Sequence, residues 1–439
     1  GPALEWDRYY PTVTLTSRLT RTFGREVAIV TGGSEVIGQS FDMTTNPPSN
    51  PTWNTYEGLV LLDPTNTATP TGLAVDTFGT GTNVVRTFEG PDDQVQQNRL
   101  LEEYPRVHWI DSNEIVTSGY GPLSSKVQHE VPPIQPGAWS YSTGQSSIPM
   151  PGPNIPSFVH RHDGASVMFA RYGALTNFIG RMGGFTEEFG GGAATSTTEY
   201  IPNAAGAPGT QWVQGPYMVQ SRAWLNAVVL PDSTVVVVGG VPTREPTVAT
   251  LAQWLAIAQG AELLVNGAFV TLPSATTPRG YHATAVLLPD GRVLVGGGEG
   301  RRDFVTPSFD YEIYSPWYMT QLRPSIMAIS QSPSLGANPD GSTKVQYNSA
   351  LTIDLTLPKF VGMGKIVLMA PGSVTHHSDM HARYVELEQI GAIIDMSSGV
   401  AKVVCSMPPE GLAPRGYYMV FAVTAGGVPS PAGWIQITN

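Results

Sequence analysis

One hairpin pattern recurs through much of the sequence. Its clearest copy has an apolar strand over residues 281–288, a Pro289-Asp290-Gly291 turn and a second apolar strand over 292–295, followed by three glycines. Proline presets φ and glycine accepts a positive φ, so the tripeptide predicts a tight turn. Glycines that close a strand indicate the close approach of another backbone. Four further copies are 10–15 with 27–33, 104–110 with 114–119, 163–169 with 178–184, and 223–230 with 235–240.

Hairpins of one design that are separated by variable insertions are typical of the blades of a kelch-type β-propeller. Five copies are fewer than such a propeller is expected to need. Either further blades have diverged within residues 34–100 and 121–158, or an N-terminal piece is missing or is supplied by another chain. The one convincing helical period lies at 244–260, where we expect a surface helix.

The pattern changes near Arg323. Short strands without closing glycine pairs predict a small antiparallel sandwich of the immunoglobulin type. We therefore expect two domains, a propeller over residues 1–322 and a sandwich over 323–439. The strands predicted in the second domain are 351–357, 365–369, 400–405, 417–423 and 433–438.

Composition excludes several classes of function. The formal net charge is −11, and no basic stripe offsets it, which disfavours nucleic acid as a partner. The single cysteine, Cys405, excludes an internal disulfide and cysteine-based zinc or iron–sulfur sites, and we expect it to be a buried small apolar residue. The apolar runs are too short for a membrane span.

Tyr281 and His282 stand side by side at the entrance of the clearest hairpin. Neighbours on a strand point to opposite faces, so both can meet one ligand only where the chain bends at a strand end. Taken alone, the pair fits a strand end that is hydrogen-bonded to a loop; taken with His376, it indicates a metal site. We expect His377 and His381 to be solvated loop residues and His108 to lie in the core.

Two other residue types have a structural and a functional interpretation. Arg8 and Arg279 each precede a candidate tyrosine by two positions, and we favour a salt bridge between blades over a substrate contact. Four tryptophans could line a pocket, but aromatic residues in propellers more often pack between sheets: Trp6, Trp109, Trp224 and Trp317.

Several motifs, in order along nearly the whole chain, resemble the galactose oxidase / glyoxal oxidase family of copper-radical oxidases. The motifs near the C-terminus are the most specific, because kelch propellers in general lack them. The matching segments are 8–13, 279–282, 287–293, 311–316, 370–376, 413–421 and 427–430. The resemblance implies an all-β fold, in which a seven-bladed kelch-type β-propeller is followed by an immunoglobulin-like β-sandwich that sends a histidine loop to a central copper.

The resemblance also implies roles for four residues. Tyr281 would be the axial tyrosine and catalytic base, and His282 and His376 would be the two imidazole ligands of Cu²⁺. Tyr10 would be the equatorial tyrosine that holds the tyrosyl radical. In the family a thioether joins that tyrosine to a cysteine of the preceding blade, and Cys405 does not match that position.

The function implied is that of an extracellular or cell-surface oxidase. It would oxidise a small aldehyde or primary alcohol with O₂ and release H₂O₂. One alternative is a non-catalytic kelch propeller that binds a glycan or a protein partner. Another is the C-terminal part of an oxidase that an N-terminal partner chain or fragment completes and supplies with the cysteine.

Overall fold

The computed structural model describes the chain in segments. In the N-terminal part it describes nine short strands, almost entirely as backbone. Beyond them it describes residues 161, 163–171, 176–186, 192–202, 213–299 and 308–438. Tyr10 and Arg8 lie outside the described residues. Within the described part no helix is long and apolar enough to cross a membrane.

The two N-terminal sheets are antiparallel. The first has the order β1 (Thr12–Leu15), β2 (Val27–Thr31), β3 (Tyr56–Val60) and β4 (Ala74–Asp76). The second has the order β5 (Arg106–Asp111), β6 (Glu114–Ser118), β7 (Ser124–His129) and β8 (Trp139–Tyr141), and β9 (Ser147–Ile148) also pairs with β7.

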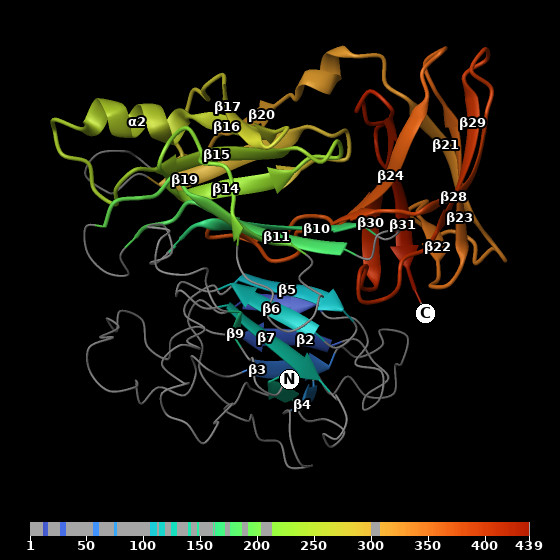
Figure 1. Cartoon of the computed structure of the whole chain (residues 1–439), viewed down its shortest axis with the longest axis horizontal. Helices are drawn as coiled ribbons and strands as arrows, with labels where there is room; N and C mark the ends of the chain where they lie inside the picture. Colours follow the sequence, from blue (N-terminus) through green and yellow to red (C-terminus); the bar gives the residue numbers. More distant parts are fainter. Residues whose placement is uncertain are drawn as a thin grey trace.

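Three further antiparallel sheets follow in sequence order and lie above the first two in Figure 1. The third sheet contains β10 (Ala165–Arg171), β11 (Thr176–Met182), β12 (Thr198–Pro202) and β13 (Val213–Gln214). The fourth contains β14 (Ala223–Val229), β15 (Val235–Val241), β16 (Ala261–Val265) and β17 (Ala268–Leu272). The fifth contains β18 (Tyr281–Leu287), β19 (Val293–Glu299) and β20 (Tyr311–Tyr314).

All five predicted hairpins are confirmed as the antiparallel pairs β1/β2, β5/β6, β10/β11, β14/β15 and β18/β19. The predicted helix is α2 (Leu251–Gln259), which buries Trp254, Ile257 and Ala258. The fold is all-β, as expected. The described residues do not show a closed ring of sheets, so the seven-bladed propeller stays a prediction.

The C-terminal region is a pair of packed sheets. A 3₁₀ helix, η2 (Trp317–Thr320), leads into the first sheet, which has the order β21 (Ser325–Ser332), β23 (Ala350–Thr356), β29 (Val400–Ser406) and β28 (Gln389–Ile394). The second contains β27 (Tyr384–Glu386), β24 (Met363–Met369), β30 (Gly416–Thr424), β31 (Gly433–Ile437) and β22 (Thr343–Val345). Apolar residues of both sheets, such as Ile353, Val403 and Val420, form one buried core. All five strands predicted here are present.

One strand pairing joins the two parts of the chain. Strand β27 runs parallel to β10, with Phe169 opposite Tyr384 and Arg171 opposite Glu386. The third sheet therefore continues into the second C-terminal sheet, and Figure 1 shows the C-terminal strands beside the ends of β10 and β11. The division into domains 1–322 and 323–439 stays a prediction. The pairing fixes the segment 370–383, which precedes β27, against the third sheet.

A buried arginine precedes the first strand of the third, fourth and fifth sheets. Each guanidinium donates to the carbonyl of a closing glycine and pairs with a glutamate of the third strand in the same sheet. We call this arrangement the arginine clamp. The glycine contacts are Arg161 to Gly183 (3.1 Å), Arg222 to Gly239 (2.7 Å) and Arg279 to Gly297 (2.7 Å). The ion pairs are Arg161 with Glu199 (2.5 Å), Arg222 with Glu262 (2.7 Å) and Arg279 with Glu312 (3.2 Å).

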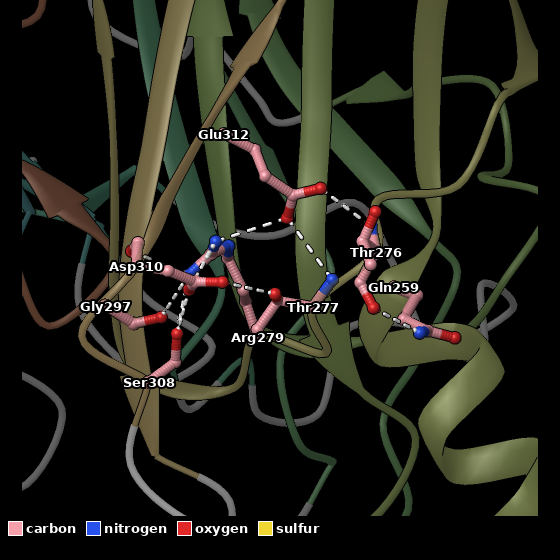
Figure 2. Close-up of polar contacts among 8 residues, drawn as sticks. All are labelled: Gln259, Thr276, Thr277, Arg279, Gly297, Ser308, Asp310 and Glu312. Carbon is pink, nitrogen blue, oxygen red and sulfur yellow. Dashed lines mark hydrogen bonds and ion pairs between the residues drawn. The ribbon is translucent and has the colours of Figure 1, made fainter.

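Figure 2 shows the clamp of the fifth sheet, in which Arg279 also contacts Asp310 at 3.1 Å. Glu312 accepts hydrogen bonds from the backbone N–H groups of Thr276 (2.7 Å) and Thr277 (3.3 Å), so it also fixes the segment before the arginine. Our expectation of a salt bridge between blades was wrong in its partners. The carboxylates belong to the fifth sheet, which is the sheet of Arg279 itself. In that sheet the clamp arginine lies beside the third strand.

The link to the neighbouring sheet uses the backbone. The N–H of Gly240 donates to the carbonyl of Arg279 at 2.8 Å, and the N–H of Gly184 donates to that of Arg222 at 3.0 Å. Gly239 has φ +65°, and a Cβ there would lie 2.7 Å from the carbonyl oxygen of Arg279. This position therefore requires glycine, because a side chain there would collide with the backbone of the clamp arginine in the next sheet.

His108 joins the second and third sheets. Its Nε2 lies 2.6 Å from the Ser166 hydroxyl, and the ring is buried, as expected for a core histidine. Burial, and after it the charges of Arg383 and Arg106, lower its pKa from 6.5 to about 3.

The clamp yields a test of stability. We expect Glu262→Gln to lower the free energy of unfolding by about 3–5 kcal/mol, because it leaves the Arg222 charge buried without its counter-charge. Denaturant unfolding measures the change. Asp354→Asn is the matched control, because Asp354 pairs with Lys402 on the surface, and we expect it to change stability by less than about 1 kcal/mol. Equal effects of the two substitutions would contradict the importance of the clamp.

His108 yields a test with pH. Between pH 6.5 and 3 the unfolded ring binds a proton and the native ring does not, so its contribution to stability is present above pH 6.5 and decreases as the pH falls. We expect His108→Gln to reduce the slope of unfolding free energy against pH by about 1.4 kcal/mol per unit between pH 6 and 4. Urea unfolding of both proteins over that range measures it. Parallel curves for wild type and variant would show that His108 does not resist protonation.

Candidate metal centre

Tyr281 and His282 lie at the start of β18, where the backbone bends. His282 has φ +117°, a region that residues other than glycine rarely adopt. The two ring centroids are only 3.8 Å apart, with 30° between the ring planes. The bend therefore brings two consecutive side chains together, as the prediction from strand geometry requires.

His376 lies at the tip of a two-residue hairpin between β25 (Val374–Thr375) and β26 (Ser378–Asp379). His376 and His377 have φ +47° and +68°, as in a type I′ turn. That turn ordinarily takes Asn-Gly, so two histidines there store strain of about 1–3 kcal/mol each. Strained backbone of this kind is concentrated at functional sites.

The hairpin tip and the bent strand end meet. The Nε2 atoms of His282 and His376 are 2.7 Å apart, and their rings are nearly perpendicular at 89°. The ring centroid of Tyr281 is 5.6 Å from that of His376. The structure thus brings together three of the four residues predicted for the copper site, and the fourth, Tyr10, lies outside the described residues.

The opposite ring nitrogens of both histidines also have partners. His282 Nδ1 is hydrogen-bonded to Glu299 Oε1, and His376 Nδ1 lies 2.8 Å from the hydroxyl of Thr375. Burial, and then the charge of His282, lower the pKa of His376 to about 4. His376 is therefore neutral at physiological pH, as a metal-ligating imidazole must be.

These donors fit a copper ion. A 2.7 Å gap between two imidazole nitrogens holds a shared proton, or it places both lone pairs beside one cation. Among the described residues there is no group of three or more His, Cys, Asp or Glu side chains that could bind a metal. The two imidazoles, with the phenol ring of Tyr281 beside them, offer a nitrogen and oxygen donor set that suits tetragonal Cu(II).

An aromatic wall lies behind Tyr281. The ring of Trp224 lies 5.1 Å from that of Tyr281 and 5.1 Å from that of Phe185, between centroids. The Trp224 indole donates to Asp163 Oδ2 at 2.8 Å, and Arg244 lies 3.6 Å from the same oxygen. Trp224 thus packs between sheets, as expected, and also contacts the candidate site. Trp317 does not follow the expectation, because it is 46% exposed; Trp6 and the side chain of Trp109 lie outside the described residues.

The sequence carries a signal for this wall that we overlooked in predicting the site. Asp163, Trp224 and Tyr281 each stand two residues after a clamp arginine, at Arg161, Arg222 and Arg279. The same position of three successive sheets therefore supplies neighbouring side chains. Tyr10 follows Arg8 at the same spacing.

The expectation for two neighbouring histidines was wrong. His377 is only 2% exposed, and neither of its ring nitrogens has a hydrogen-bond partner in the described structure. Burial lowers its pKa to about 3. His381 is half-buried, and burial lowers its pKa to about 4. The β25–β26 hairpin carries His377 at its tip and ends two residues before His381. It packs against β18 and β10, which buries His377.

Cys405 is fully buried in β29, among apolar residues such as Leu351 and Val420 of the C-terminal core. Burial raises the pKa of its thiol to about 12, so the thiol stays protonated at neutral pH. The expectation of a buried apolar cysteine is confirmed.

Several known proteins are similar to this chain in sequence or in fold. The aldehyde oxidase GLOX of Vitis pseudoreticulata is 26% identical over 365 residues, which cover 78% of this chain and 64% of that protein. A galactose oxidase of Gibberella zeae is 26% identical over 311 residues, which cover 69% of this chain and 42% of that protein. The chain therefore spans less than two thirds of the length of these curated relatives.

A solved structure matches the fold of the whole chain, and a family model matches its C-terminal part. A fungal alcohol oxidase of the AA5 family, solved in complex with copper, has the same fold with a TM-score of 0.67 and 20% identity, covering 99% of this chain and 77% of its own. Residues 324–437 match the galactose oxidase-like early set domain. These matches support the resemblance to the galactose oxidase / glyoxal oxidase family in both sequence and fold.

Proposed function

We propose that this chain is a copper-radical oxidase that oxidises a small aldehyde or primary alcohol with O₂ and releases H₂O₂. The observation that carries the proposal is the convergence of His282 and His376, which are 94 residues apart, on one point beside Tyr281. The relatives named as aldehyde and galactose oxidases support the same reaction class.

Four side chains would hold copper. They are the Nε2 atoms of His282 and His376 and the phenol oxygens of Tyr281 and Tyr10. The chemistry that copper and a tyrosyl radical supply when bound is a two-electron oxidation of the substrate, one electron each. Tyr10 is proposed to carry the radical, and an extracellular location is proposed from the family resemblance alone.

The remaining steps belong to the protein's own groups. Tyr281 is the first residue of β18, at the bent strand end. Its phenolate would accept the proton that leaves the substrate carbon. Trp224, which packs against the fully buried Phe185, covers one side of Tyr281 and restricts the approach of water from that side. The Asp163 carboxylate fixes the indole through its N–H.

The family resemblance also implies a propeller scaffold and a thioether crosslink. A seven-bladed propeller is proposed as the scaffold. Because Cys405 is enclosed in the C-terminal core, no thioether within this chain is proposed. No observation on the described residues favours a glycan-binding or protein-binding module, or completion by a partner chain.

Metal analysis and oxygen consumption test the proposal together. We expect the purified wild-type chain to bind one copper ion and to consume O₂ with glyoxal, methylglyoxal or galactose, releasing an equal amount of H₂O₂. We expect His376→Ala to weaken copper binding by at least about 100-fold. The substitution removes a ligand, and loss of a residue that only supports a ligand already lowers metal affinity about 10–100-fold. The activity should disappear with the metal.

His381→Ala is the matched control, because His381 lies in the same segment and is also half-buried but is not one of the proposed ligands. It should keep both copper and activity. A wild-type chain that binds no copper, or a His376→Ala variant that binds it as tightly, would refute the oxidase proposal.

A further inference from the structure

The two candidate imidazole ligands have different second partners. His282 Nδ1 faces a carboxylate oxygen of Glu299, and His376 Nδ1 faces the hydroxyl of Thr375. A carboxylate at neutral pH only accepts hydrogen bonds, whereas a hydroxyl both donates and accepts. The two histidines are therefore constrained in different ways.

Glu299 fixes the proton of His282. Because the carboxylate accepts, Nδ1 carries the ring proton and Nε2 carries a lone pair that points toward His376. Glu299 is the last residue of β19 and stands opposite Tyr281 in the ladder between β18 and β19. The same pairing that places the tyrosine thus places the carboxylate beside the next residue.

Thr375 leaves two states open to His376. In the metal-free protein the His376 Nε2–H donates across the 2.7 Å gap to the lone pair of His282, and the Thr375 hydroxyl donates to His376 Nδ1. When a cation takes both Nε2 lone pairs, the His376 proton must lie on Nδ1, where the same hydroxyl accepts it. The number of protons on the pair does not change, and no buried N–H is left without a partner.

We propose that Glu299 and Thr375 are positioning residues that set which ring nitrogen of each ligand carries the proton, Glu299 by fixing His282 and Thr375 by serving both states of His376. The proposal rests on the proposed copper site. Partners of this kind orient a ligand and raise its basicity, and their loss typically lowers metal affinity 10–100-fold. The charged partner is expected to contribute more than the hydroxyl.

The first test needs no metal. Nitrogen-15 NMR of the metal-free, ¹⁵N-histidine-labelled chain distinguishes the two neutral forms of each of its eight histidines. We expect the resonance that disappears in His282→Asn to show a protonated Nδ1, the less common form, and to lose that preference in Glu299→Ala. A protonated Nε2 on His282 in the wild type would overturn the proposal.

The second test measures copper(II) affinity by competition titration, together with the electron paramagnetic resonance spectrum. We expect affinity to fall about 100-fold in Glu299→Ala and about 10-fold in Glu299→Gln, whose neutral amide still offers an acceptor. Thr375→Val should lose about 10-fold and Thr375→Ser should restore it. The copper hyperfine splitting should shift in Glu299→Ala, which a change in stability alone would not cause.

Glu388→Gln, on an exposed residue of the same C-terminal region, is the control and should match the wild type. If the wild type binds copper and Glu299→Ala and Thr375→Val bind it equally well, this proposal fails and the oxidase proposal stands. If the wild type binds no copper, the oxidase proposal fails and the positioning role fails with it.

Discussion

The buried pairing of arginine with glutamate at the edge of each sheet is the interaction on which the site depends. It recurs in three successive sheets, and the carbonyls of Arg222 and Arg279 each accept an N–H from the preceding sheet's glycine pair. The clamp thereby fixes the backbone two residues before Asp163, Trp224 and Tyr281. A buried charge pair is weak evidence for stability by itself, because desolvation opposes the attraction. Its use here is positional, since it aligns one residue of each sheet with the next.

Strain is concentrated where the two histidine-bearing segments meet. Three residues with positive φ, His282, His376 and His377, lie within one small region, and each conformation is unfavourable by about 1–3 kcal/mol. The surrounding structure must offset this. The parallel pairing of β27 with β10 and the apolar core of the C-terminal sheets hold the hairpin in place from one side. The clamp of Arg279 holds the bent strand end from the other.

Local patterns predicted the local structure well. The five hairpins, the helix α2 and the C-terminal strands follow from turn residues and apolar runs, and the family resemblance selected Tyr281, His282 and His376. The burial of His377 could not be predicted, because a histidine pair at a hairpin tip carries no sign of insertion between sheets. Glu299 was missed because its partnership with His282 depends on the strand bend and register. The joining of β10 to β27 links residues more than 200 positions apart, for which the sequence has no local signal.

The proposed metal centre depends on two imidazoles at one copper ion. Pulsed electron paramagnetic resonance of the copper(II)-loaded wild-type chain counts coordinated imidazole nitrogens directly, and comparison with His376→Ala and His282→Ala assigns them. The geometry predicts couplings from two imidazoles in the wild type and from one in each single variant. A single coupling in the wild type, or two that persist in either variant, would show that His282 and His376 do not share an ion.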